Sequence, residues 1–174
     1  MERYKNLYEE IKKECINDGI VVTETTLIQI KTRGAGLTGG IGFIDLDIDN
    51  NEELGIWVDE NETDEMKLRI TLHEFGHCLY YKKVGYKNLQ TEKNINELQF
   101  KINSEYEAHK YQLERTKQIV ESNGDFEFLK VTLKKFEEKK VGKTPEYKPA
   151  IEKLMAINLW TECTELVSTL ENRI

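Results

Sequence analysis

One segment, residues 62–84, sets the strongest limit on how this chain of 174 residues can fold. Its apolar residues recur at intervals of three and four, the period of one face of an α-helix. These residues are Leu68, Leu72, Phe75 and Leu79. The segment opens with acidic residues and closes with Lys82 and Lys83, and Gly85 follows it, as is usual at helix termini. The pattern therefore predicts a long helix with one side packed against a core.

The remaining segments are mainly helical after residue 62 and rich in β-branched residues before it. Helical periodicity is present in residues 4–17, 94–121, 125–140 and 150–170. Strand patterns are present in residues 20–23, 26–31, 43–48 and 56–58. The predicted fold class is α+β: a small antiparallel sheet packed on the helix of residues 62–84, with a mainly helical C-terminal half. We predict a single domain, 1–174, with a core of residues 1–122 and a helical extension of residues 123–174.

The strand at residues 43–48 alternates apolar and acidic residues. Ile44, Leu46 and Ile48 are expected on the buried face of the sheet, and the aspartates between them on the wet face. Before it, residues 34–39 fit the glycine-rich nucleotide fingerprint, which should open a helix. Because a strand pattern follows instead, we interpret these residues as a loop, at the rim of any cleft.

Composition excludes several classes of protein. No apolar run approaches the length of a membrane span, and the N-terminus lacks the apolar region of a secretory signal. We therefore expect a cytoplasmic protein with no membrane partner. A formal net charge of −7 argues against direct nucleic-acid binding. Three cysteines without paired spacing indicate neither a disulfide framework nor a cysteine zinc site.

A metal-site pattern, H-E-x-x-H, lies within the predicted helix at His73, Glu74 and His77. At about 100° per residue, the two histidines differ by about 40° and stand one turn apart, so both imidazoles can bind one ion. Glu74 lies about 100° further round the helix, where its carboxylate could accept a proton from a water beside the metal. The pattern predicts a Zn²⁺ site on the side of the helix opposite its apolar stripe.

A catalytic zinc needs a third protein ligand. The candidates on the helix of residues 94–121 are Glu97, Glu105, Glu107, Glu114 and His109. We take its apolar stripe as Ile95, Leu98, Ile102, Tyr106, Leu113 and Val120. Glu105 lies about 60° and His109 about 20° from Ile102, whereas Glu107 lies more than about 100° away. Glu105 and His109 are therefore the pair expected to face inward.

Residues 1–115 resemble the ImmA/IrrE family of zinc metallopeptidases. The resemblance rests on Thr71-Leu72-His73-Glu74-Phe75-Gly76-His77 and on the later Glu105-Tyr106-Glu107-Ala108-His109, which is similar to the family's E-x-E-A-N motif. The family usually has Asn at the position of His109. The resemblance implies that Glu105 is the third zinc ligand. It also implies a protein substrate, such as a helix-turn-helix repressor of a phage or other mobile element.

These patterns lead to one principal hypothesis and one alternative. The principal hypothesis is a zinc-dependent endopeptidase in which His73, His77 and Glu105 bind the metal and Glu74 is the general base. The oxyanion donor is open among His109, Tyr80, Tyr81, Tyr106 and Tyr111, and His109 could instead lie behind the ligands. The alternative is a non-catalytic protein-binding module that acts through its helical C-terminal part.

Overall fold

The computed structural model describes residues 2–33 and 39–172. The chain forms two compact units, Met1–Thr91 and Glu92–Ile174. Helices predominate, and a small sheet belongs to the first unit. The predicted α+β class, with a small sheet and a helical C-terminal half, is thereby confirmed.

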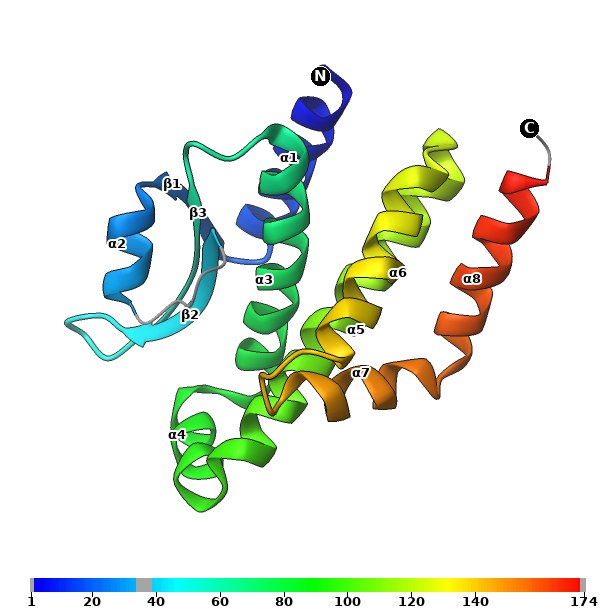
Figure 1. The fold of residues 1–174 in the computed structure, drawn as a ribbon. Helices are drawn as coiled ribbons and strands as arrows, with labels where there is room; N and C mark the ends of the chain where they lie inside the picture. The colour runs from blue at the N-terminus through cyan, green and yellow to red at the C-terminus, as the bar shows by residue number, and fades with distance from the viewer. Residues whose placement is uncertain (1, 34–38, 173–174) are drawn as a thin grey trace. The chain divides into compact units, whose positions relative to one another are not determined.

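The first unit contains three helices and a three-stranded sheet. In chain order its elements are α1 (Glu2–Asn17), β1 (Ile20–Thr25), α2 (Leu27–Thr32), β2 (Gly40–Leu46), β3 (Glu52–Asp59) and α3 (Asp64–Val84). The strand order is β1-β3-β2, which leaves β2 at one edge. Figure 1 shows α1 and α3 on one side of the sheet and α2 on the other.

Helix α3 follows the prediction from its apolar stripe. Leu68, Leu72 and Phe75 are buried in the first unit together with side chains of α1 and the sheet. The Thr63 hydroxyl accepts a hydrogen bond from the backbone N–H of Met66 and so caps the N-terminus. Gly85, at φ 80°, ends the helix in a conformation that glycine adopts without strain. The helix that carries the H-E-x-x-H pattern is thus anchored by its opposite face.

The sheet differs from the prediction in two respects: it is mixed instead of antiparallel, and residues 26–31 are not one of its strands. β2 pairs antiparallel to β3, whereas β1 pairs parallel to it. Residues 26–31, predicted as a strand, form α2 instead. Thr26 and Gln29 make a capping box there, in which the Thr26 side chain accepts from the Gln29 backbone N–H. This cap overrides the strand preference of the β-branched residues, and α2 carries the chain from one edge of the sheet toward the other.

The predicted face of β2 does pack inward, but only its first half is buried. Leu46 is 41% exposed and Ile48 is 97% exposed, and the buried positions are Gly40 and Gly42. The reason is that α3 packs closely on the glycine half of the strand. The other half leads to a turn, in which Asn50 has a φ of 63°. Most of the glycine-rich segment 34–39 lies outside the described residues.

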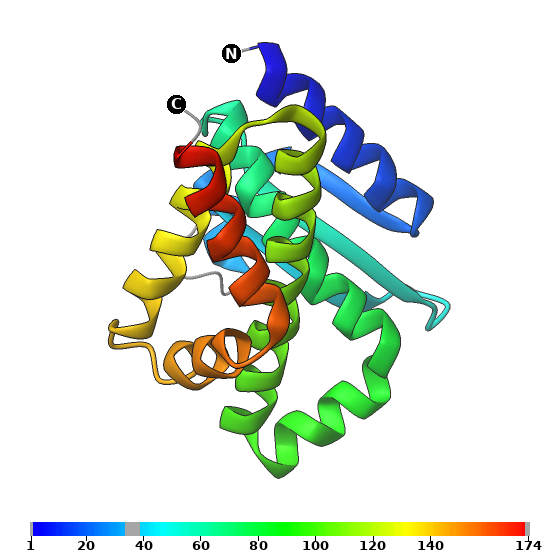
Figure 2. The same ribbon diagram turned by 90° about the vertical axis from the view of Figure 1, so that its right-hand side faces the viewer.

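The second unit is helical. Helix α4 (Tyr86–Ile95) spans the boundary between the units and leads to α5 (Glu97–Asn123), α6 (Phe126–Lys140), α7 (Tyr147–Met155) and α8 (Asn158–Glu171). In Figures 1 and 2, α7 runs crosswise to α6 and α8. Its core contains Leu113 of α5, Leu129 and Phe136 of α6, Ile151 of α7 and Trp160 of α8.

Two predictions for this unit are corrected. The predicted last helix is two helices, because the extended backbone of Ile157, at φ −96° and ψ 155°, breaks it between α7 and α8. Helix α4 was not expected, and Ile95 at its end is 79% exposed, so it does not belong to the apolar stripe of α5. Asn96 begins α5 instead by accepting a hydrogen bond from the Gln99 backbone N–H.

None of the helices in the described ranges combines the length and apolar character needed to cross a membrane.

Candidate metal centre

The two histidines of α3 face each other one turn apart. Their Nε2 atoms lie 3.2 Å apart, and their rings are nearly perpendicular, at 85°. Two nitrogens bound to one tetrahedral zinc at 2.0–2.1 Å would lie about 3.3 Å apart. The separation in the structure therefore suits two ligands of a single ion. It also suits a direct hydrogen bond from one imidazole to the other.

The surroundings of the pair restrict how its rings can move. His77 is only 7% exposed, and the Tyr81 ring stacks on it at 5.9 Å between centroids and 21° between planes. Tyr81 lies one helical turn after His77, so the stack follows from the helix geometry itself. Of the tyrosines considered as oxyanion donors, Tyr81 thus contacts a histidine of the pair, and Tyr106 lies in the core of the second unit.

Glu74 is held by the edge strand of the sheet. Its side chain is buried, and Oε2 accepts a hydrogen bond of 2.7 Å from the backbone N–H of Gly42. A side chain at Gly42 would not fit, because a Cβ there would lie 2.7 Å from the Glu74 carbonyl oxygen and 3.2 Å from the Cys78 Sγ. The close approach of β2 and α3 therefore fixes one oxygen of the carboxylate.

Cys78, next to the histidine pair in sequence, points into the sheet. Its thiol donates to the carbonyl of Gly55 at 3.4 Å. Burial raises the pKa of the Cys78 thiol, and the nearby Glu74 carboxylate raises it further. Because the thiolate is the form that binds metals, this cysteine is unsuited to be a ligand. The chain's three cysteines, Cys15, Cys78 and Cys163, are all buried free thiols.

One candidate metal-binding group occurs among the described residues. It consists of His73, His77 and Glu105, whose ligand atoms all lie within 4.8 Å of one another. The other carboxylates considered from the sequence, Glu97, Glu107 and Glu114, belong to no such group in the described parts of the chain. Two imidazole nitrogens and one carboxylate oxygen are a ligand set that zinc uses in catalytic sites.

His109 lies in the interior of the second unit. It is fully buried, and its ring contacts Phe136 of α6 edge-on at 4.8 Å between centroids. Nδ1 lies 2.6 Å from the backbone carbonyl oxygen of Glu105, and Nε2 lies 3.1 Å from the Lys139 Nζ. Both ring nitrogens therefore have polar neighbours within the second unit.

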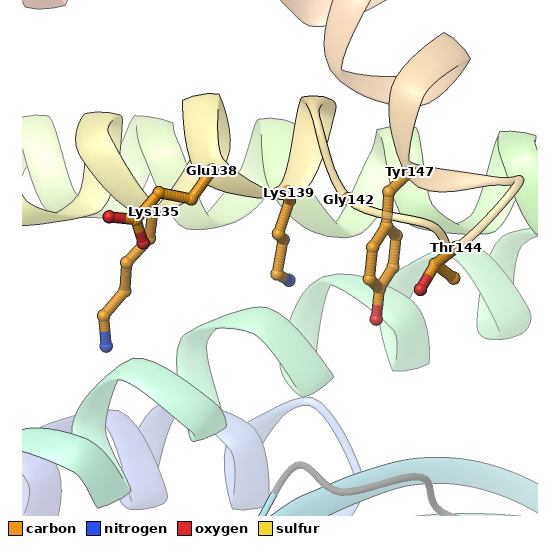
Figure 3. Close-up of a pocket in the computed structure, with 6 residues that line it drawn as sticks. All are labelled: Lys135, Glu138, Lys139, Gly142, Thr144 and Tyr147. Atoms are coloured by element: carbon orange, nitrogen blue, oxygen red, sulfur yellow. The ribbon is translucent and has the colours of Figure 1, made fainter.

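A pocket of about 390 Å³ lies next to Lys139, the residue that contacts His109 Nε2. It is lined by Lys135, Glu138, Lys139, Gly142, Thr144 and Tyr147. Figure 3 shows the side chains of Lys135, Lys139 and Tyr147 extending toward the same side, the first two from α6 and the third from the start of α7. The Lys139 ammonium lies 4.8 Å from the centroid of the Tyr147 ring.

Gly42 and Lys139 were not predicted from the sequence to take part in these contacts. The contact of Gly42 could have been predicted, because a glycine inside a strand often marks a close approach of another backbone. The contact of Lys139 could not, since this residue lies 30 positions from His109 in a charge-rich helix.

Comparisons with protein-family models, with curated proteins and with solved structures found no match for this chain.

Proposed function

We propose that this protein is a zinc-dependent endopeptidase. The observation that carries the proposal is the pair of facing imidazoles on α3, 3.2 Å apart at Nε2, with the oriented carboxylate of Glu74 between them in sequence. Glu105 supplies the third ligand, and the distances within the group of three support this assignment. The likeness of residues 71–77 and 105–109 to the ImmA/IrrE motifs supports it independently.

The proposed chemistry is hydrolysis of a peptide bond. When bound, Zn²⁺ would polarise the peptide carbonyl and lower the pKa of water to about 7. Glu74 acts as general base and accepts a proton from the attacking water. The water oxygen adds to the carbonyl carbon, the C–N bond breaks, and Glu74 returns the proton to the leaving amine. The Gly42 N–H holds Oε2 of this carboxylate in place.

The substrate of the proposed reaction is a protein. The resemblance to ImmA/IrrE peptidases favours a DNA-binding repressor of the helix-turn-helix type, encoded by a phage or another mobile element, and a cytoplasmic site of action. Repressor cleavage requires no direct contact with nucleic acid, which agrees with the net charge of −7.

The metal is the first part of the proposal to test. We expect purified protein, supplemented with zinc and desalted, to carry about one zinc per chain by elemental analysis. His73→Ala and His77→Ala should each strongly reduce the metal content, because each removes one of three ligands. Glu107→Ala is the control, since it removes a possible ligand side chain that lies outside the group of three. A wild-type protein with no stoichiometric zinc would rule out the enzyme.

The second test separates catalysis from binding. Glu74→Gln removes the base and keeps an oxygen that can accept from Gly42, so we expect normal zinc content and folding. Cleavage of an unfolded protein such as casein should fall by orders of magnitude. Full activity in this variant would exclude Glu74 from the mechanism. A wild-type protein that binds zinc and a partner protein but cleaves neither would instead support the alternative, a non-catalytic binding module.

A further inference from the structure

Lys139 of α6 contacts the buried His109 of α5. Lys139 lies near the end of α6, and its Nζ is 3.1 Å from Nε2 of the fully buried His109 on α5. A lysine ammonium can only donate hydrogen bonds, so the Nε2 atom must accept. His109 then carries its proton on Nδ1.

The position of Nδ1 agrees with this tautomer. It lies 2.6 Å from the backbone carbonyl oxygen of Glu105, a group that can only accept. The same nitrogen lies 3.5 Å from Oε2 of the Glu105 carboxylate. The N–H of His109 therefore donates to the Glu105 backbone carbonyl, and the Glu105 carboxylate lies beside the same nitrogen without accepting its hydrogen bond. The orientation of the N–H is fixed from the other side of the ring by the Lys139 ammonium.

We propose that Lys139 is a positioning residue for the metal ligand Glu105 and acts through His109. The inference rests on the proposed function, because it takes Glu105 as a ligand. A cation at Nε2 polarises the imidazole and makes Nδ1–H a stronger donor. The more positive Nδ1–H attracts the Glu105 carboxylate, whose Oε2 lies 3.5 Å away, and so favours one orientation of that side chain before a metal binds.

The packing around Lys139 supports a fixed position for its ammonium. The Tyr147 ring lies 4.8 Å from Nζ, and Phe136 packs against the edge of the His109 ring. Lys139 also lines the pocket of Figure 3, so water can reach part of its side chain. The ammonium thus lies between the Tyr147 ring and the buried imidazole of His109.

The test is the zinc dissociation constant of the full-length protein, measured by competition with a chromophoric chelator. Lys139→Met keeps the length of the side chain and removes the charge, so we expect zinc to bind about ten-fold more weakly. Lys135→Met is the matched control, one turn earlier on α6 and lining the same pocket, and should change the constant less than about two-fold. Lys139→Arg should restore most of the affinity.

A double-mutant cycle tests whether Lys139 acts through His109. His109→Phe should weaken zinc binding, and adding Lys139→Met to it should cause no further loss. An unchanged constant in Lys139→Met, or losses that multiply in the double variant, would overturn the proposal. If Lys139→Met does not fold, Lys139→Gln takes its place, and an unchanged constant there is equally contradictory.

A readout without metal separates this inference from the proposed function. In the apo protein, the ¹⁵N resonances of the His109 ring should show the Nδ1–H tautomer, and the Nε2 resonance should shift in Lys139→Met. Wild-type protein that binds no zinc but shows this shift would refute the peptidase and, with it, the role of Lys139 toward a ligand. Zinc binding without the shift would refute only the role of Lys139.

Discussion

The backbone N–H of Gly42 orients the carboxylate of Glu74. The Gly42 N–H is available because β2 is an edge strand, and it is close enough because nothing projects from Gly42 toward α3. A backbone donor on a strand moves less than a donor on a long side chain. The proposed base is thus positioned by the sheet, and the residue that matters for this is the glycine.

Gly42→Ala tests this close packing. The added Cβ would lie 2.7 Å from the backbone oxygen of Glu74, so the strand and the helix must separate. We expect the free energy of unfolding to fall by about 2 kcal/mol, within the range for overpacked sites, as measured by urea denaturation. Gly39→Ala is the control, since its Cβ would meet the flexible side chains of Glu62 and Ile70. Equal stability of the two variants would mean that β2 and α3 can pack together with a side chain at position 42.

Residues on one helix could be placed from sequence alone, and contacts between distant segments could not. His73 and His77 share a face because the helical period requires it. The contact between Gly42 and Glu74 spans 32 positions, and that between His109 and Lys139 spans 30. Such contacts depend on how elements pack, and a periodic pattern contains no information on packing partners.

At the level of elements, helix α3 has two tasks. It keeps His73 and His77 one turn apart on one face, and it buries Leu68, Leu72 and Phe75 in the core of the first unit with the other. Its first turn combines the Thr63 cap with Asp64 and Glu65, which favour a helix N-terminus electrostatically. Its last turn has Lys82 and Lys83, which favour the C-terminus. The ends of the helix are therefore stabilised independently of the side chains proposed to bind the metal.

Thr63→Ala should remove one of these contributions and leave the others. The cap hydrogen bond to the Met66 N–H is lost, and we expect about 1 kcal/mol less stability in thermal or urea unfolding. Thr91→Ala is the control, because the Thr91 hydroxyl only donates to the Lys87 carbonyl within α4. That change should stay within about 0.5 kcal/mol. A Thr63 variant as stable as wild type would show that water replaces the cap at no cost.

Caps and breaks also explain which elements were predicted wrongly. Residues 26–31 have strand-forming side chains, yet a two-residue capping box makes them a helix. The helix predicted for residues 150–170 is interrupted at Ile157, where neither proline nor glycine is present to signal a break. Alternation in β2 predicted the correct inward face, but α3 covers that face at Gly40 and Gly42 and leaves Leu46 and Ile48 exposed. In each case a local contact or packing outweighed the periodicity.

At the scale of the whole molecule, a metal that binds only the folded chain adds to its stability. A metal bound by His73, His77 and Glu105 would therefore raise the free energy of unfolding. Binding to the native state alone raises stability by about 2.7 kcal/mol when free zinc is one hundred times the dissociation constant. The rise in melting temperature on adding zinc therefore shows how tightly each variant binds the metal.

Glu105→Ala and Glu107→Ala, compared by this measure, test the assignment of the third ligand. The two glutamates are two positions apart on α5, about 200° round the helix, so only one can face a given ion. If Glu105→Ala weakens zinc binding about one hundred-fold, the same zinc concentration should stabilise that variant by only about 0.4 kcal/mol. Glu107→Ala should keep the full zinc-dependent rise and change the stability of the apo protein by about 0.5 kcal/mol at most. The opposite result, with the zinc effect lost only in Glu107→Ala, would require α5 to be rotated by about half a turn, and it would shift the resemblance to the E-x-E-A-N motif by two residues.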